Sequence, residues 1–79
     1  MEQSNHKSDL EILTHNLRWL RRQHRYSQKE MAVILKIGIG SLSKLERGEI
    51  PPRLSVDFLF AVYDHFGIKP SVLLSVWME

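Results

Sequence analysis

The chain of 79 residues contains no cysteine, which excludes a disulfide framework and any metal site built on thiolates. It has no apolar run approaching the roughly 18 residues that a membrane-spanning helix needs. Its first residues, MEQSNHKSD, lack the apolar core of a signal peptide. We therefore expect one cytoplasmic domain with no membrane partner.

The sequence also lacks a pattern typical of catalysis or metal binding. Its four histidines are His6, His15, His24 and His65, and they follow neither the spacing of metal ligands nor that of a nucleophile with its base. We expect no enzyme activity, no catalytic residue, no metal and no cofactor.

Charge is unevenly distributed along a chain whose net charge is only +2. Residues 18–53 contain nine lysines and arginines against three glutamates, a net charge of +6, whereas residues 1–17 and 54–79 each sum to −2. A basic centre between acidic ends suits a polyanion bound on one face. A basic surface that simply faces solvent would give the same numbers.

Apolar residues recur at helical spacing and nowhere alternate as in a strand, which predicts an all-α fold. Residues 1–7 are expected to form a flexible arm, and residues 8–79 a single domain. Five helices are expected. The first begins near residue 9 and frays near 24–26, and the second begins at 28 and ends before a turn at 36–38. The others span 39–47, 56–66 and a stretch from 70 towards 77.

Two capping boxes mark helix starts, because a serine is followed three residues later by a glutamate at Ser8 and Glu11 and again at Ser27 and Glu30. In each box the two side chains satisfy backbone N–H groups that the first turn of a helix leaves free. Ser55 is the expected N-cap of the helix over 56–66, and Gly67 its end.

Residues 27–48, SQKEMAVILKIGIGSLSKLERG, are typical of two short helices joined by a tight turn. Such helices approach closely, which favours a small residue midway along the first one, and Ala32 supplies it. Gly48 is the expected left-handed stop. The apolar residues expected to pack between the helices are Met31, Leu35, Ile37, Leu42 and Leu45.

These residues carry a resemblance to a known family. The sequence resembles the lambda-repressor-like (Cro/CI, Xre-type) helix-turn-helix domain at Leu20-Arg21, from Ser27 to Ala32, at Leu35 and from Leu42 to Gly48. Phe66-Gly67-Ile68 and Leu73-Leu74 resemble the C-terminal end of that domain. The resemblance covers roughly residues 10–75 and implies a compact five-helix domain that regulates transcription by binding double-stranded DNA.

The resemblance also implies roles for matching residues. Gln28 is expected at the N-terminus of the second helix, where it touches a DNA phosphate; helix N-termini suit anions. Arg21 and Glu46 are expected to form a partly buried salt bridge, so Arg21 is assigned to structure. For Arg18, Arg22 and Arg25 a solvated surface charge is at least as good an interpretation.

Further contacts are expected from the outward face of the third helix and from the loop behind it. Lys44 lies between inward leucines and is long enough to reach a base or a phosphate. The residues expected to bind DNA are Gln28, Lys29, Ile39, Gly40, Ser41, Ser43, Lys44, Arg47 and Arg53.

The chain departs from the family pattern at the turn and at the front of the third helix. Lys36 stands where a left-handed glycine is usual, and Gly38 where serine or threonine caps the helix. Ile39 and Gly40 occupy places that normally hydrogen-bond base edges, and neither has a polar side chain.

Two interpretations of this front remain open. The domain binds DNA through phosphates, DNA shape and Lys44, as a homodimer on a two-fold operator, or it is a protein-interaction module, such as an antitoxin-type component that binds a partner protein. The apolar tail at 73–78 offers a surface for a second copy, although packing of the last helix onto the core would also account for it.

Overall fold

The computed structural model describes residues 8–79; the expected arm over residues 1–7, which includes His6, lies outside the described residues. Residues 8–79 contain helices and connecting segments but no strand, which confirms the predicted all-α fold. No helix in this described part of the chain has the length and apolar character needed to span a membrane. The helices are α1 (Asp9–Gln23), α2 (Gln28–Leu35), α3 (Ile39–Glu46), α4 (Asp57–Phe66) and α5 (Pro70–Leu73).

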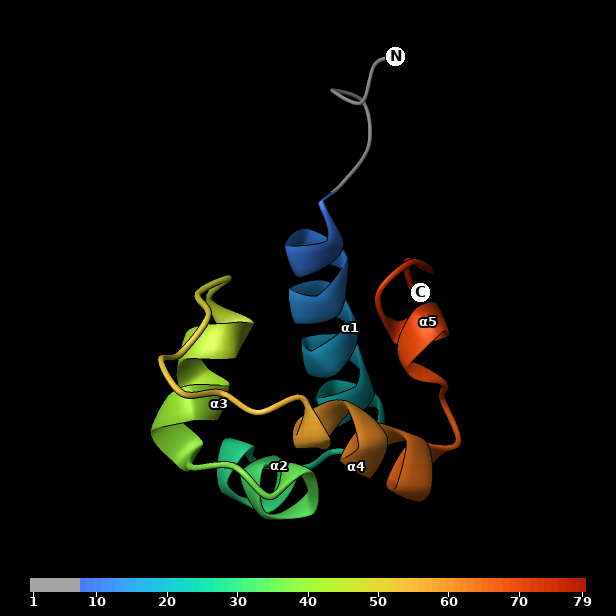
Figure 1. Cartoon of the computed structure of the whole chain (residues 1–79). Helices are drawn as coiled ribbons and strands as arrows, with labels where there is room; N and C mark the ends of the chain where they lie inside the picture. The colour runs from blue at the N-terminus through green and yellow to red at the C-terminus, as the bar shows by residue number, and fades with distance from the viewer. Residues whose placement is uncertain (1–7) are drawn as a thin grey trace.

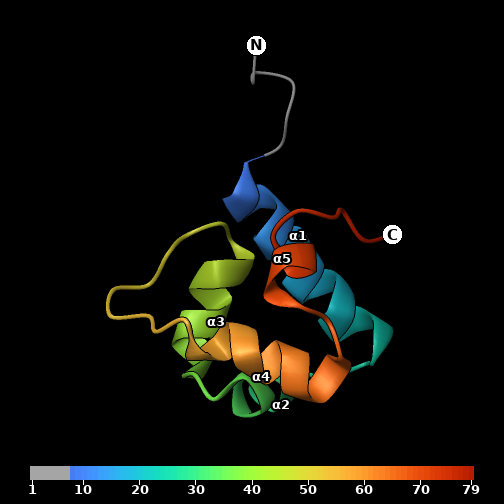
Figure 2. The same ribbon diagram turned by 45° about the vertical axis from the view of Figure 1, so that its right-hand side comes forward.

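The helices surround α1, as Figure 1 shows. Helix α3 lies on one side of α1 and α5 on the other, while α2 and α4 lie together across the end where α1 finishes. Figure 2 shows the segment between α3 and α4 swinging out from the body of the domain. Helix α3 therefore packs against both α1 and α2.

One hydrophobic core joins all five helices. Helix α1 contributes Leu13, Leu17 and Leu20, which recur at helical spacing and are buried, whereas Leu10, which continues the same spacing towards the N-terminus, is only half-buried. The other large apolar side chains of the core are Met31, Leu35, Leu42, Leu45, Phe58, Val62 and Leu73.

Helix starts and stops follow the local signals in the sequence. Both capping boxes are present: the Glu11 amide donates to the Ser8 hydroxyl over 3.1 Å, and the Glu30 amide to the Ser27 hydroxyl over 3.0 Å. Gly48 has φ +85° and so adopts the predicted left-handed conformation, which a side chain makes costly.

Three predicted helix limits are wrong. Helix α3 ends at Glu46, with Arg47 as its cap rather than its last residue. Helix α4 starts at Asp57, one residue late, and its N-cap is Val56 rather than the predicted Ser55, whose hydroxyl accepts from the Asp57 amide over 3.1 Å. Helix α5 has four residues and stops at Leu73, well short of Trp77.

A fully buried asparagine holds the chain that follows α5 against α1. The side-chain amide of Asn16 donates to the carbonyls of Leu73 (2.8 Å) and Val76 (2.7 Å), and the Met78 amide donates to the Asn16 side-chain oxygen (3.0 Å). The buried Leu73 carbonyl, which the end of α5 leaves without a helical partner, is thereby satisfied. Beside it, His15 stacks on Trp77 with ring centroids 3.6 Å apart.

Candidate nucleic-acid interface

The outward face of α3 is the candidate interface. Ile39, Gly40 and Lys44 are exposed there, and Ser41 and Ser43 are half-buried. The inward face holds Leu42, Leu45 and Glu46, all of which are buried. Leu42 and Leu45 thus face inward and Lys44 outward, as the spacing predicted.

The front of α3 has open space around its two glycines. Gly38 is the N-cap with φ −71°, and no side chain caps the helix there. A Cβ added at Gly38 or at Gly40 would meet no atom within 4 Å, and neither residue has a positive φ. The fold itself therefore does not require glycine at either place. Ile39, between them, is 52 % exposed.

The turn before this front contains the left-handed residue that its family position predicts. Lys36 caps α2 with φ +62°, in the place where glycine is usual. A non-glycine residue in this conformation costs about 1 kcal/mol. The turn geometry is thus retained although the side chain is unusual.

A bidentate ion pair fixes α3 to α1. Arg21 Nε donates to Glu46 Oε2 over 2.7 Å, and Arg21 Nη2 donates to Glu46 Oε1 over 2.9 Å. The two side chains are only 16 % and 5 % exposed. The hydrogen bond to Glu46 raises the pKa of the Arg21 guanidinium, although burial acts in the opposite direction. This pair orients α3, and Arg21 therefore has a structural role.

Gln28 also turns toward this ion pair. Its side-chain nitrogen donates to Glu46 Oε1 over 3.1 Å, and the residue is half-buried. An amide group has two N–H donors, so a phosphate contact at the N-terminus of α2 would use the second one. Lys29, the next residue, is exposed in the same turn.

The arginines after α3 are held in different ways. Arg47 Nη1 donates to the Ser43 hydroxyl over 2.9 Å, and its Nε lies 3.4 Å from Glu49 Oε2 in an exposed pair. Arg53 is exposed in the segment between α3 and α4, with a left-handed φ of +63°. Ser43, Lys44 and Arg47 therefore share the last turns of α3, whereas Arg53 lies apart from them.

Two further side chains of α1 also support α3: Thr14, which had no predicted role, and Arg18, which was interpreted equally well as a solvated surface charge. The Thr14 hydroxyl donates to the Leu45 carbonyl over 2.9 Å, and Arg18 Nη1 donates to the Glu46 carbonyl over 3.2 Å. The Glu46 carbonyl is one that the end of a helix leaves free, whereas the Leu45 carbonyl also accepts from the Gly48 amide over 3.0 Å. Thr14, Arg18 and Arg21 are four and three residues apart, so the spacing already placed them on one face of α1.

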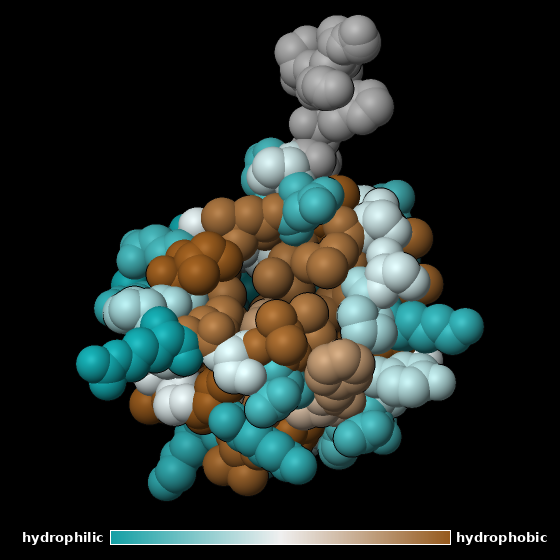
Figure 3. Space-filling view, viewed as in Figure 1, coloured by the Kyte–Doolittle hydropathy of each residue, from teal (hydrophilic) through white to brown (hydrophobic). Residues whose placement is uncertain are grey.

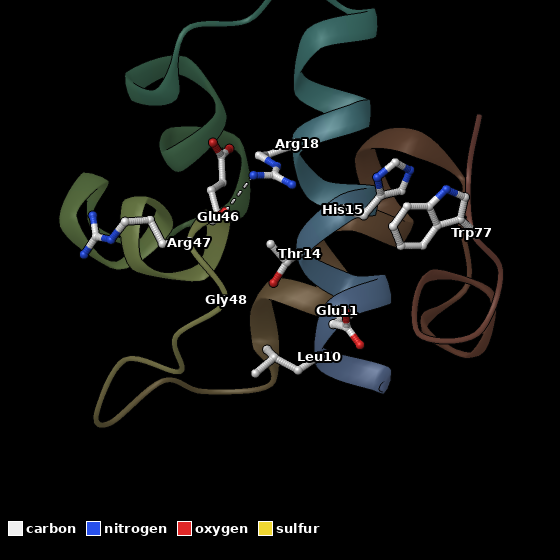
Figure 4. Close-up of a pocket in the computed structure, with 9 residues that line it drawn as sticks. All are labelled: Leu10, Glu11, Thr14, His15, Arg18, Glu46, Arg47, Gly48 and Trp77. Atoms are coloured by element: carbon white, nitrogen blue, oxygen red, sulfur yellow. Dashed lines mark hydrogen bonds between the residues drawn. The ribbon is translucent and has the colours of Figure 1, made fainter. Parts of the chain in front are cut away.

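A surface cavity of about 300 Å³ lies between α1, the end of α3 and Trp77. Figure 4 shows Arg18 turned toward Glu46, Trp77 against His15, and Arg47 pointing away from the cavity. Among its polar side chains, Thr14, Arg18 and Glu46 join α1 to α3, and His15 joins α1 to the C-terminal segment. Of the residues expected to bind DNA, Arg47 alone lines this cavity.

No curated protein and no solved structure gives a significant match to the chain. A family model described as helix-turn-helix matches residues 17–73. That match covers most of the chain and includes the whole of α2, α3 and α4. The chain therefore belongs to the helix-turn-helix family of Cro/CI and Xre type, a family of DNA-binding regulators.

Proposed function

We propose that the chain is a small cytoplasmic transcription regulator that binds double-stranded DNA with α3 in the major groove. The observation that carries the proposal is the division of α3 into two faces. The outward face presents Lys44 with two serines, and the inward face is locked to α1 through Glu46. A rigid helix with exposed donors suits insertion into a groove about 12 Å wide.

Phosphate contacts would come from both sides of this helix. Lys29 and the second N–H of Gln28 lie at the N-terminus of α2, where the helix dipole favours an anion. Arg47 lies beside the end of α3, and Arg53 extends the basic surface along the following loop. Such contacts supply affinity and register rather than sequence discrimination.

Base readout would be narrow in this protein. Lys44 can donate to a base edge, Ser41 can contact the adjacent backbone or a base, and the exposed Ile39 side chain can touch a thymine methyl group. Gly40 lets the helix backbone approach the DNA closely. We therefore propose that DNA shape and phosphates contribute much of the recognition, and that two copies occupy half-sites roughly 34–36 Å apart.

Duplex affinity should fall steeply with salt. Four cationic side chains per copy, Lys29, Lys44, Arg47 and Arg53, would neutralise four phosphates and predict a slope near −3.6 in log affinity against log salt, or about a 100-fold loss from 50 to 200 mM. Replacement of Lys44 or Arg53 by alanine should lower both the affinity and the slope, as measured by titration of labelled duplex.

Lys69→Ala is the matched control, because this exposed lysine precedes α5, across α1 from α3. It should bind as the unmodified protein does. Absence of duplex binding even at low salt would contradict the proposed function.

A second candidate is a protein-interaction module, in which α3 contacts a partner protein. The observation that favours it is the front of α3, where an exposed isoleucine lies between two glycines. Selection of bound sequences from a random duplex pool separates the two. A recovered palindrome or a preference for A·T tracts supports the regulator, and no enrichment over input supports the module.

Gly40→Ala should stabilise the domain and weaken its binding to DNA. Alanine meets no atom within 4 Å at this place and favours a helix interior by about 1 kcal/mol over glycine. The added methyl group would, however, separate the helix backbone from the groove. Thermal melting and duplex titration of the same variant measure the two effects.

Gly48→Ala is the contrasting control, because its φ of +85° makes any side chain unfavourable. It should lower the melting temperature. If Gly40→Ala raises stability and leaves duplex affinity unchanged, Gly40 does not lie at the DNA surface.

A further inference from the structure

A groove runs along one face of α1. The cavity of about 300 Å³ drawn in Figure 4 adjoins a second cavity of about 180 Å³, because His15 and Arg18 line both. Their floor is a row of α1 residues at intervals of four, which lie on one face of the helix: Leu10, Thr14, Arg18 and Arg22. The residue after each of these lines the cavities as well. We call the two cavities together the α1 groove.

The α1 groove has the length of a short peptide. Its lining extends from Leu10 to Gln23, which is about 20 Å at 1.5 Å of rise per helical residue. Figure 4 shows the end of α3 on one side of α1 and Trp77 on the other, so the N-terminal part of the groove has two walls. An extended chain advances about 3.3 Å per residue, and about six residues would therefore span the groove.

The groove has more positive charge than its own acidic groups balance. Arg22 is exposed and has no hydrogen bond or ion pair with any residue from 8 to 79. Arg18 donates one N–H to the Glu46 carbonyl, which leaves the other N–H donors of its guanidinium for a ligand. The acidic side chains of the lining are engaged: Glu46 lies in its ion pair with α1, and Glu11 accepts a backbone N–H in the first capping box. An anionic ligand would therefore meet two guanidinium groups.

Both tryptophans of the chain line the groove. Trp77 is 37 % exposed although it stacks on His15, and Trp19 is half-buried. Tryptophan and arginine are enriched among the residues that carry most of the binding energy at protein interfaces. An aromatic side chain of a ligand would thus find an indole to pack on, a few residues from the arginines.

We propose that the α1 groove binds an extended acidic segment of a partner protein, about six residues long and with one aromatic side chain. Carboxylates of the segment pair with Arg18 and Arg22, because a guanidinium offers two parallel N–H donors to the two oxygens of a carboxylate. The aromatic side chain packs on Trp77. Arg47 is the one residue that the groove shares with the DNA surface, and Figure 4 shows its side chain pointing away from the cavity. The segment and a duplex therefore bind to different side chains, and segment binding requires no DNA.

Fluorescence titration tests the groove directly, since both tryptophans line it. The probe is a blocked hexapeptide of aspartate and glutamate with one central phenylalanine. At low salt it should change the tryptophan emission of the unmodified protein and saturate below millimolar concentration.

Arg22→Glu should weaken binding of this hexapeptide at least about tenfold, because it places a like charge beside the carboxylates. Lys36→Glu is the matched control, since it reverses the same charge on a residue that lines a separate cavity. It should bind the hexapeptide nearly as the unmodified protein does. Thermal melting verifies that both variants remain folded.

Two control peptides separate the contribution of charge from that of the aromatic contact. Hydrophobic side chains reach the surface across the middle of the face that Figure 3 shows. Because such a surface binds apolar peptides regardless of charge, one control keeps the phenylalanine and replaces every acidic residue by serine; it should bind at least about tenfold more weakly. The other replaces the phenylalanine by glutamate. Trp77→Ala should weaken binding of the phenylalanine peptide more than that of this acidic one, as calorimetry would measure.

Four results would overturn the proposed groove. They are no binding of the hexapeptide up to millimolar concentration at low salt, equal binding of its serine version, equal losses in Lys36→Glu and Arg22→Glu, and loss of peptide binding in Lys44→Ala. The last would place the peptide on α3 as a mimic of DNA phosphates. A single-stranded oligothymidylate that binds more tightly than the hexapeptide, and loses affinity in Arg22→Glu, would assign the groove to nucleic acid instead.

Duplex titration of the same samples keeps the two proposals apart. A protein that binds duplex but no acidic peptide overturns only the role of the α1 groove. A protein that binds the peptide but no duplex overturns only the proposed function.

Discussion

Glu46→Ala is expected to lower the free energy of unfolding by about 3 kcal/mol, at the lower end of values for a broken buried ion pair because Arg21 keeps some solvent contact. The substitution removes the acceptor of both Arg21 bonds and of the Gln28 bond. It would leave a half-buried guanidinium without its counterion. Urea denaturation measures the loss, which corresponds to a fall in melting temperature of about 12 °C or more for a domain of this size.

Glu49→Ala is the matched control for this prediction. Its pair with Arg47 is exposed on both sides and longer, at 3.4 Å, so its removal should change stability by less than about 1 kcal/mol. Equal effects of the two substitutions would show that burial of the Arg21–Glu46 pair does not govern stability. Duplex binding by Glu46→Ala should also fall, since α3 would lose its fixed orientation.

Asn16→Ala is expected to destabilise the domain by about 3 kcal/mol. It removes three hydrogen bonds to the segment after α5, each worth about 1 kcal/mol, and leaves the Leu73 carbonyl and its neighbours without a partner in the interior. Denaturation measures the total loss. Amide hydrogen exchange at Met78 should accelerate, because that amide donates directly to Asn16.

A change elsewhere in the same segment serves as the control. Ser75→Ala removes only an exposed hydroxyl that donates to the Ser71 carbonyl, and should have little effect on stability. If Met78 exchanges at the same rate in Asn16→Ala as in the unmodified protein, Asn16 does not hold this segment in place.

The sequence predicted what depends on neighbours along the chain. Both capping boxes, the left-handed Gly48 and the burial of Met31 and Leu42 follow from spacing and backbone preference alone. Such signals act within one or two helical turns. They were sufficient for the helix order and for the two faces of α3.

Contacts between distant segments were harder to predict. Asn16 meets residues 57 to 62 positions further along the chain, and its side chain gives no local sign of that role. Because the sequence carries no sign of these contacts, α5 was expected to continue towards Trp77. Gln28 and Arg18 both turn toward Glu46, because long polar side chains follow the partners that packing brings near. The Arg21–Glu46 pair was expected only because the family resemblance supplied it.

The empty space around Gly38 and Gly40 has a consequence for how such a protein can evolve. Under the proposed function, these places face the DNA, yet no atom of the fold fills the space beside them and neither backbone has a positive φ. A single mutation there could introduce a serine, an arginine or a glutamate without repacking the interior. New operator preferences could then arise while the core, the caps and the Arg21–Glu46 pair stay as they are. Selection could thus change which genes the protein controls without first having to restore its folding.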